Sequence, residues 1–380
     1  MLIPVLKSVT ILLAASLSAT ALAAPAPSQF APIPVYSIYP PVKPHSSADE
    51  ALASGRVVEE DFPMAARASK PWRIAFLFPH IKDPYWVDCT YGLVSEARRL
   101  GVAIDIFPAD GYNDLIGQLR KMDELIGAHY DALVISPISQ TGTNPAIAKA
   151  RARGIPVFEL ANDSTSDDLT IKITSSLKSM GSDATDWVIR DAVRRGLKSI
   201  NLGLLPGPSD AGWVQGEVAG TREAARKAAI KVNILDIRYG DSDLIGQTRL
   251  AEEMIAKHGA RLDYLLGCTD CAPAAIWPVR QAGLSKKIRI VAYGLTREMI
   301  AMIRNGEILA ATDVKAVSQA RVTLDAAVNF LEGRTDPLPH TVLIKLGMVD
   351  HDNYQHYDYD ITTSPKNYTP VLSYSPGSLR

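Results

Sequence analysis

The chain contains 380 residues, of which 47% are hydrophobic and 21% are charged, as in ordinary soluble globular proteins. The formal net charge of −1 gives no support to a nucleic-acid-binding surface. Beyond the N-terminus, no stretch reaches the roughly 18 consecutive apolar residues of a membrane span, and the length allows more than one domain.

The first predicted segment is a signal peptide at residues 1–23. Lys7 precedes an apolar run from Val9 to Leu17, and small residues at positions 21–23 fit the A-x-A cleavage pattern. An N-terminal anchor helix is the alternative, but the apolar run is short and a cleavage site follows it. We therefore expect an exported protein whose mature form is periplasmic.

Residues 24–70 are rich in proline, and we expect an extended N-terminal arm with little core of its own. The continuous apolar run Ile74–Phe78 then predicts a strand that is buried on both faces. Strand and helix patterns alternate from this point, which is typical of a parallel doubly wound sheet. The first unit has predicted strands at 74–78, 102–107, 132–136 and 155–160, and predicted helices at 86–100, 114–126 and 144–153.

A second unit repeats this alternation from residue 200. Its predicted strands lie at 200–205, 232–237, 264–267, 288–293, 308–312 and 342–346. Its predicted helices lie at 213–227, 243–257, 274–281, 297–305 and 317–331. The tail at 349–380 is rich in Tyr, Asp and Pro, and we expect it to wrap the surface.

One sequence word marks the two units as copies of each other. Asp-Leu-Ile-Gly-Gln occurs at Asp114–Gln118 and again at Asp243–Gln247, and Trp86 and Trp213 each begin a helix at a similar spacing. Solenoid repeats recur every roughly 20–50 residues, so a period of domain size indicates one unit that occurs twice. We predict an α/β protein with two doubly wound parallel-sheet lobes around a cleft. Its ligand should lie beyond the carboxyl ends of the strands.

Three cysteines are present, and an odd count does not indicate a disulfide framework. Cys268 and Cys271 form a C-x-x-C that could close a small disulfide or serve redox chemistry in an oxidising compartment. We favour two small residues at a strand end, because a lone C-x-x-C is a weak signal. The tail histidines have no recognised metal-ligand spacing and no catalytic motif is present, so we expect no metal, no cofactor and no enzyme.

Short sequence motifs in the loops after the predicted strands resemble those of a known family. Phe78–Trp86 and Glu96–Arg99 in the first unit, and Leu205–Gly212 and Gly240–Asp243 in the second, resemble TorT-like periplasmic sensor proteins. These proteins form a branch of the type I periplasmic-binding-protein superfamily. The resemblance implies a protein that recognises trimethylamine N-oxide (TMAO) and signals to a membrane sensor histidine kinase of the TorS type.

The resemblance also implies how the chain is divided between the lobes. The chain would cross from one lobe to the other three times. Lobe one would comprise residues 71–175 plus 295–320, and lobe two residues 178–293 plus 325–348, with the C-terminal tail following at 349–380.

The family's ligand site is an aromatic box. Its ring faces attract a methylated cation, with an interaction energy of roughly 0.5–2 kcal/mol per contact. By the matching sequence motifs, the resemblance implies that Tyr85, Trp86 and Tyr112 belong to this aromatic box. At two box positions the chain departs from the family pattern, because Leu177 and Gly294 stand where aromatic residues are expected. The candidate ligand-binding residues are Asp83, Tyr85, Trp86, Tyr112, Ser136, Asp210, Trp213, Asp270, Tyr293 and Asp313.

Several of these candidates also have a simpler structural explanation. Asp83, Asp210 and Asp313 stand beside predicted helix starts, where an aspartate side chain caps the helix. Asp270 occupies a loop in which sugar-binding relatives place a ligand-contacting carboxylate, or it caps the next helix. Trp213 could be a packing residue in the first turn of its helix.

Three functional hypotheses result from these patterns. In the favoured one, a ligand closes the cleft and the changed surface is read by the sensor kinase. The alternative is the substrate-binding component of an ABC importer for a sugar or an amine, because one fold serves both classes. The third is an exported enzyme or redox protein that uses the C-x-x-C cysteines. No nucleic-acid partner is expected.

Overall fold

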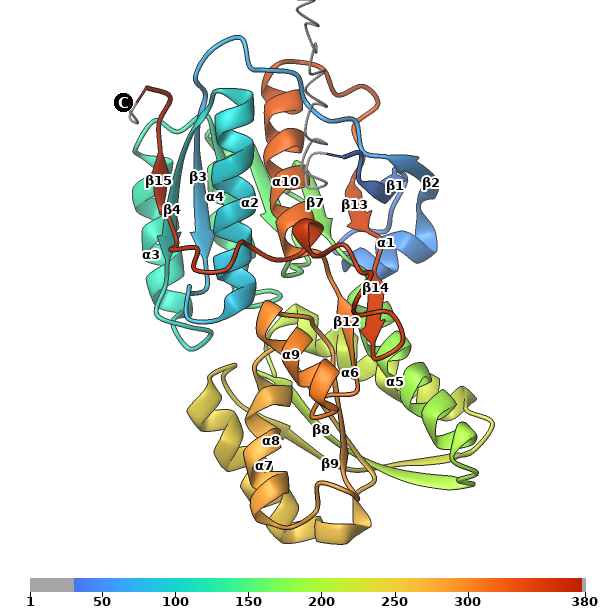
Figure 1. The fold of residues 1–380 in the computed structure, drawn as a ribbon. Helices are drawn as coiled ribbons and strands as arrows, with labels where there is room; N and C mark the ends of the chain where they lie inside the picture. The colour runs from blue at the N-terminus through green and yellow to red at the C-terminus, as the bar shows by residue number, and fades with distance from the viewer. Residues whose placement is uncertain (1–30, 378–380) are drawn as a thin grey trace, which may run out of the picture.

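The computed structural model describes residues 31–377, which form two α/β lobes, each built on one sheet whose central strands run parallel (Figure 1). The predicted fold class is confirmed. The predicted signal peptide lies outside the described residues. Within residues 31–377, no helix has the length and apolar character needed to cross a membrane.

The two sheets share one strand order, which accounts for the sequence repeat. The parallel core runs β4-β3-β5-β6-β7 in the first sheet and β9-β8-β10-β11-β12 in the second, so each copy has the 2-1-3-4-5 order of a doubly wound fold. The first-lobe strands are β3 (Arg73–Phe78), β4 (Ala103–Pro108), β5 (Ala132–Ile135), β6 (Val157–Leu160) and β7 (Ile171–Thr174). The second-lobe strands are β8 (Ser199–Gly207), β9 (Lys231–Tyr239), β10 (Tyr264–Gly267), β11 (Arg289–Ala292) and β12 (Ala310–Asp313).

The repeated word builds the same helix start in both lobes. Asp114 and Asp243 cap α3 (Leu115–Ile126) and α7 (Leu244–His258), each by accepting a hydrogen bond from the glycine N–H three residues later, at 2.9 and 2.8 Å. A Cβ on the first of these glycines would lie 2.1 Å from the capping carboxylate, so a larger residue here would displace the cap. The glutamine that follows is buried, and its side-chain amide bonds the backbone of a nearby loop.

Two elements between the repeats are absent from the sequence-based prediction. Strand β7 and helix α5 (Leu177–Arg194) lack a clear sequence pattern, because Lys172 interrupts the apolar run of β7 and α5 is rich in small and polar residues. The remaining first-lobe helices are α2 (Pro84–Leu100), α4 (Asn144–Ala152) and α10 (Ala316–Leu331). The remaining second-lobe helices are α6 (Gly212–Lys227), α8 (Cys271–Gln281) and α9 (Arg297–Asn305).

The N-terminal segment extends the first sheet and is not the coreless arm that its composition predicted. Strand β1 (Pro34–Tyr39) pairs antiparallel with both β13 (Thr341–Ile344) and β2 (Arg56–Asp61). Helix α1 (Ala48–Ser54) lies between β1 and β2 in the chain and packs against the same core. Pro34 occupies the first position of its strand, where proline is tolerated, so the prolines do not prevent pairing.

The expected lobe assignment is wrong for α9 and β12, which lie in the second lobe, and for residues 325–344, which lie in the first. Helix α9 packs in the second-lobe core and β12 pairs with β11, whereas α10 packs on α2 and β13 pairs with β7. The chain therefore crosses between the lobes after β7, after β12 and after β13. Buried parallel strands carry the same apolar pattern whichever neighbour they pair with, so local sequence does not reveal their sheet.

The C-terminal tail crosses between the lobes once more (Figure 1). Strand β14 (Gly347–Asp350) pairs antiparallel with β12, and β15 (Ser373–Tyr374) pairs antiparallel with β4. Between these strands, the Tyr357 and Thr362 hydroxyls donate hydrogen bonds of 2.6 and 2.7 Å to the Asp313 carboxylate. The tail thereby binds to the chain at the point where β12 leaves the second sheet.

Helices α5 and α6 pack through glycine. A Cβ on Gly181 would lie 1.9 Å from the carbonyl oxygen of Glu217, and a Cβ on Gly220 would lie 1.9 Å from that of Lys178. These distances are far inside van der Waals contact, so the two helix backbones touch directly. This contact determines where α6 presents its side chains to the other lobe.

We expect Gly220→Ala to lower the free energy of unfolding by about 1–3 kcal/mol, because the added methyl group has no room between the two backbones. Gly127→Ala is the matched control, since its Cβ would meet its nearest atom at 3.5 Å. Chemical denaturation of both variants measures the difference. Equal stability of the two variants would contradict the direct backbone contact.

Candidate functional site

A cavity of about 70 Å³ lies between the lobes, where the carboxyl ends of strands from both sheets meet. A buried water needs roughly 10–15 Å³, so this space admits a small solute. Its first-lobe wall consists of Asp83, Tyr85, Trp86, Tyr112, Ala161, Asn162, Thr174 and Gln319. Its second-lobe wall consists of Leu177, Met180, Trp213, Glu217, Ser242, Thr269, Gly294 and Val314.

The start of α2 contributes three of the predicted residues. The Asp83 carboxylate caps the helix by accepting a hydrogen bond from the Trp86 N–H at 3.1 Å, and Pro84 occupies the first helical turn. The rings of Tyr85 and Trp86 meet at right angles, with 5.0 Å between their centroids. Trp86 is 2% exposed and also packs on Phe78, so it belongs to the hydrophobic core as well as to the cavity wall.

A pair of aromatic rings joins the two walls. Tyr112 of the first lobe lies edge-on to Trp213 of the second lobe, with 5.9 Å between ring centroids. The amide of Asn162 donates a hydrogen bond of 3.1 Å to the Tyr112 hydroxyl, which orients that ring. Trp213 lies against Gly207, where a Cβ would come within 2.5 Å of the indole. The position of each ring therefore depends on its own lobe and on the partner ring.

Carboxyl groups line the cavity from both lobes, and none of the described residues that line it is basic. Glu217 lies on α6 and is 1% exposed, and burial raises the pKa of its carboxyl well above the ordinary value. On the opposite wall, burial and the neighbouring Asp270 carboxyl raise the pKa of Asp83. Because an uncompensated charge in such surroundings is unfavourable, the site suits a cationic or hydrogen-donating ligand.

Three lining residues have a buried polar atom without a hydrogen-bond partner in the described part of the chain. These atoms are Trp213 Nε1, Glu217 Oε2 and Ser242 Oγ. Buried polar atoms are nearly always paired, and leaving one unpaired costs about 1–3 kcal/mol. All three belong to the second lobe and to one cavity, which indicates a place where a ligand supplies the missing partners.

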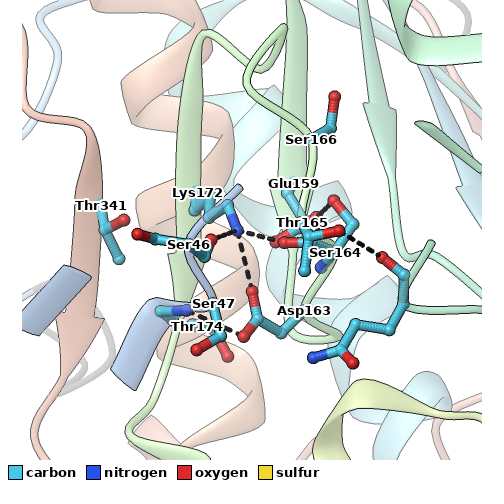
Figure 2. Close-up of polar contacts among 12 residues, drawn as sticks. Ser46, Ser47, Glu159, Asp163, Ser164, Thr165, Ser166, Lys172, Thr174 and Thr341 are labelled. Carbon is cyan, nitrogen blue, oxygen red and sulfur yellow. Dashed lines mark hydrogen bonds and ion pairs between the residues drawn. The ribbon is translucent and has the colours of Figure 1, made fainter. Parts of the chain in front are cut away.

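A buried polar cluster holds the loop that carries Asn162 (Figure 2). Lys172 of β7 donates hydrogen bonds from Nζ to the Asp163 carboxylate, at 3.0 Å, and to the carbonyl of Ser164. Asp163 also accepts a hydrogen bond of 2.8 Å from the Ala48 N–H at the start of α1. The N-terminal segment and β7 together therefore position this part of the cavity wall.

Five predicted residues do not line the cavity. Ser136 is buried at the end of β5, and Tyr293 is buried in the second-lobe core, where its hydroxyl bonds Thr221 at 2.8 Å. Asp210 is exposed, and Asp270 stands at the start of α8. Asp313 is buried and bonded to the C-terminal tail. Successive residues at a strand end point in opposite directions, so Tyr293 faces the core although the next residue lines the cavity.

Glu217 lines the cavity but is absent from the residues that the sequence predicted. Glu217 follows Trp213 by one helical turn, and this spacing places both on the same helix face, so the tryptophan was a usable signal. Leu177 and Gly294, the positions at which the chain departs from the family's aromatic box, do line the cavity. The other missed residues are small, polar or aliphatic types without a distinctive pattern, namely Ala161, Asn162, Thr174, Met180, Ser242, Thr269, Val314 and Gln319.

Cys268 and Cys271 form a disulfide, so the preference for two unbonded residues was wrong. The turn from β10 into α8 brings their Cα atoms to 4.7 Å, within the range that a disulfide spans. Both residues are buried in the second-lobe core. Cys89 is a free cysteine buried in the first lobe.

Two lobes of equal strand order, with a cavity lined from both, define a two-lobed solute-binding protein. Residues 74–335 match the family described as periplasmic binding protein domain, and the chain belongs to this family. It is 27% identical to periplasmic protein TorT of Escherichia coli (strain K12), over 87% of this chain and 94% of TorT, which confirms the predicted resemblance. It is 26% identical to the D-ribose/D-allose-binding protein of Pseudomonas aeruginosa, over 58% of this chain and 70% of that protein.

Solved structures share this fold. An ABC transporter solute binding protein from Bradyrhizobium sp. BTAi1, with bound bis-tris, matches with a TM-score of 0.74 and 31% identity, over 90% of this chain and 98% of that chain. The complex of the TorS sensor domain with TorT, determined in the absence of ligand, matches with a TM-score of 0.69 and 24% identity. That match covers 79% of this chain and 100% of the other, and it shows the fold alone.

The cluster behind Asn162 predicts a pH-dependent stability. Burial raises the pKa of Glu159, which accepts a hydrogen bond from the Ser164 N–H, from 4.5 to about 8. A raised folded-state pKa stabilises the fold fully below the unfolded pKa, and this contribution is lost as pH rises through about 8. In the wild-type protein, the free energy of unfolding should therefore fall by up to about 1.4 kcal/mol per pH unit between pH 4.5 and about 8. Glu159→Gln should abolish this fall.

Chemical denaturation at several pH values measures this effect. The control is Glu124→Gln, which alters a half-exposed carboxyl on α3 and should leave the pH profile of the wild-type protein unchanged. Parallel profiles for the wild-type protein and Glu159→Gln would contradict a carboxyl that is neutral in the folded state.

Proposed function

We propose that this chain is an exported, periplasmic binding protein that closes its lobes on a small amine, TMAO or a related compound. It reports the occupied state to a membrane sensor histidine kinase of the TorS type, and it catalyses no reaction. The observation that carries this proposal is one cavity whose walls come from both lobes and combine aromatic rings with carboxyl groups.

The chemistry of the wall supports an amine ligand. Tyr85, Trp86, Tyr112 and Trp213 supply aromatic side chains, whose faces attract a substituted ammonium group by roughly 0.5–2 kcal/mol per contact. Carboxyl groups on opposite walls can ionise beside a bound cation, and no described residue of the lining supplies a positive charge. The relative with 31% identity holds bis-tris, an amine with several hydroxyl groups, which agrees with this ligand class.

The relatives support a signalling role. TorT is similar over most of this chain, and solved structures exist of the TorS sensor domain in complex with TorT. A ligand that contacts both walls stabilises the closed form by its differential affinity for that form. The closed lobes then present a changed surface to the kinase.

The second candidate function is the substrate-binding component of an ABC importer. It is favoured by one observation, the 31% identity to an ABC transporter solute binding protein over 90% of this chain. The same closure on ligand serves transport, because a permease can also read the closed form. The two functions share the ligand site and differ in the protein that reads the closed form.

TMAO or a small amine should bind the purified protein and raise its unfolding temperature, whereas D-ribose should not. Ligand at 100 times its Kd stabilises the folded form by about 2.7 kcal/mol. Tyr112→Ala should weaken binding roughly 2- to 30-fold, because it removes one aromatic contact. Trp277→Ala removes an exposed aromatic residue of α8 and should have no effect. A shift with D-ribose and with no amine would show that the ligand class is wrong.

Deletion of the gene in its host bacterium separates sensing from import. A sensor transmits occupancy but moves no solute, so we expect the transcriptional response to the amine to disappear while uptake of the labelled amine continues. Complementation with the intact gene should restore the response, and complementation with the Tyr112→Ala variant should restore it only at higher amine concentration. Lost uptake with a retained response would instead identify an importer component.

A further inference from the structure

Glu217 is buried in the cavity wall without a hydrogen-bond partner for one carboxyl oxygen. The residue is 1% exposed, and its Oε2 atom meets no donor among residues 31–377. Within the same range, no lysine, arginine or histidine lines the cavity. An ionised carboxylate in this situation is strongly unfavourable unless something else supplies a donor or a positive charge.

The surrounding backbone keeps Glu217 in this position. A Cβ on Gly181 of α5 would lie 1.9 Å from the Glu217 carbonyl oxygen, and a Cβ on Gly216 would lie 2.5 Å from the Cβ of Leu177. Because α6 is in direct contact with α5 on both sides of this residue, the helix cannot turn the carboxyl toward solvent. The acidic group is therefore a built part of the wall.

A second unpaired polar atom lies in the same wall. The Ser242 side chain is 6% exposed and its Oγ atom has no partner among the described residues, although its backbone N–H bonds the Asp241 carboxylate at 2.9 Å. The second lobe therefore offers the cavity a carboxyl group that can ionise opposite a bound cation, and a hydroxyl group. Asp83 adds a carboxyl from the first lobe.

We propose that the ligand is a protonated amine that carries a hydroxyl group, and that Glu217 selects it. The ammonium N–H donates to Glu217 Oε2, and the ligand hydroxyl bonds Ser242 Oγ. TMAO has neither N–H nor O–H, and a quaternary amine such as choline has no N–H, so neither can place an N–H at Glu217 while a hydroxyl group reaches Ser242. This inference rests on the proposed function, because it takes this cavity as the site of a small amine.

Titration calorimetry with the purified chain tests the inference with a matched pair of ligands. Protonated N,N-dimethylethanolamine and choline differ only in whether the nitrogen bears a hydrogen or a further methyl group. We expect N,N-dimethylethanolamine to bind about tenfold or more tightly than choline or TMAO, the factor typical of one charge-assisted hydrogen bond. Glu217→Gln should lower the affinity for N,N-dimethylethanolamine by about tenfold and leave the affinity for choline unchanged.

Glu223→Gln is the control on the same helix, because its carboxylate pairs with Lys227 at the surface and does not line the cavity. A further measurement needs no variant. In two buffers of different ionisation enthalpy, the wild-type protein should release a proton when N,N-dimethylethanolamine binds, since the buried Glu217 carboxyl ionises to pair with the ammonium.

Two outcomes overturn the inference and leave the proposed function standing. One is that the wild-type protein binds TMAO or choline as tightly as N,N-dimethylethanolamine, and the other is that binding of N,N-dimethylethanolamine releases no proton. A different outcome overturns the proposed function as well. In that case no amine binds to the wild-type protein, and D-ribose does.

Discussion

Both sheets direct the carboxyl ends of their parallel strands at the gap between the lobes, and this geometry selects the residues of the site. Tyr112, Asn162, Ser242 and Thr269 all follow strands of one sheet or the other within a few residues. Beyond a strand end, the backbone is no longer hydrogen-bonded to a neighbouring strand, so the loops there can present side chains to a shared space. The cavity consequently belongs to neither lobe alone, and any solute held in it contacts both.

The aromatic rings and the carboxyl groups of this cavity act together. Rings such as Trp86 and Trp213 exclude water, and a charge interaction is stronger where water is excluded. The same exclusion leaves Asp83 and Glu217 poorly solvated, which raises the pKa of both carboxyls. A cation placed between the walls would relieve this cost on both lobes at once.

Helix α1 and the C-terminal tail, as far as residue 377, brace the region where the chain crosses between the lobes. Asp49 of α1 accepts hydrogen bonds from the Ser176 hydroxyl and from the Lys178 N–H at 2.9 Å, at the start of α5. The C-terminal tail bonds Asp313 at the end of β12 and then pairs with the first sheet. The proline-rich segment and the tyrosine-rich tail are therefore structural parts of the crossing region, and their composition reflects exposed positions and not a lack of tertiary contacts.

Local sequence determined the elements whose formation depends on neighbours in the chain. Apolar runs defined the central strands, the repeated word at Asp114 and Asp243 defined two equivalent helix starts, and the loop position of Trp86 placed it in the cavity wall. Tertiary structure decided everything that depends on distant partners. It assigned β12 and β13 to different sheets, buried Tyr293, and left Glu217 Oε2 without a partner among residues 31–377. The reason is physical: capping and periodicity act over a few residues, whereas strand pairing and desolvation depend on segments that only the fold brings together.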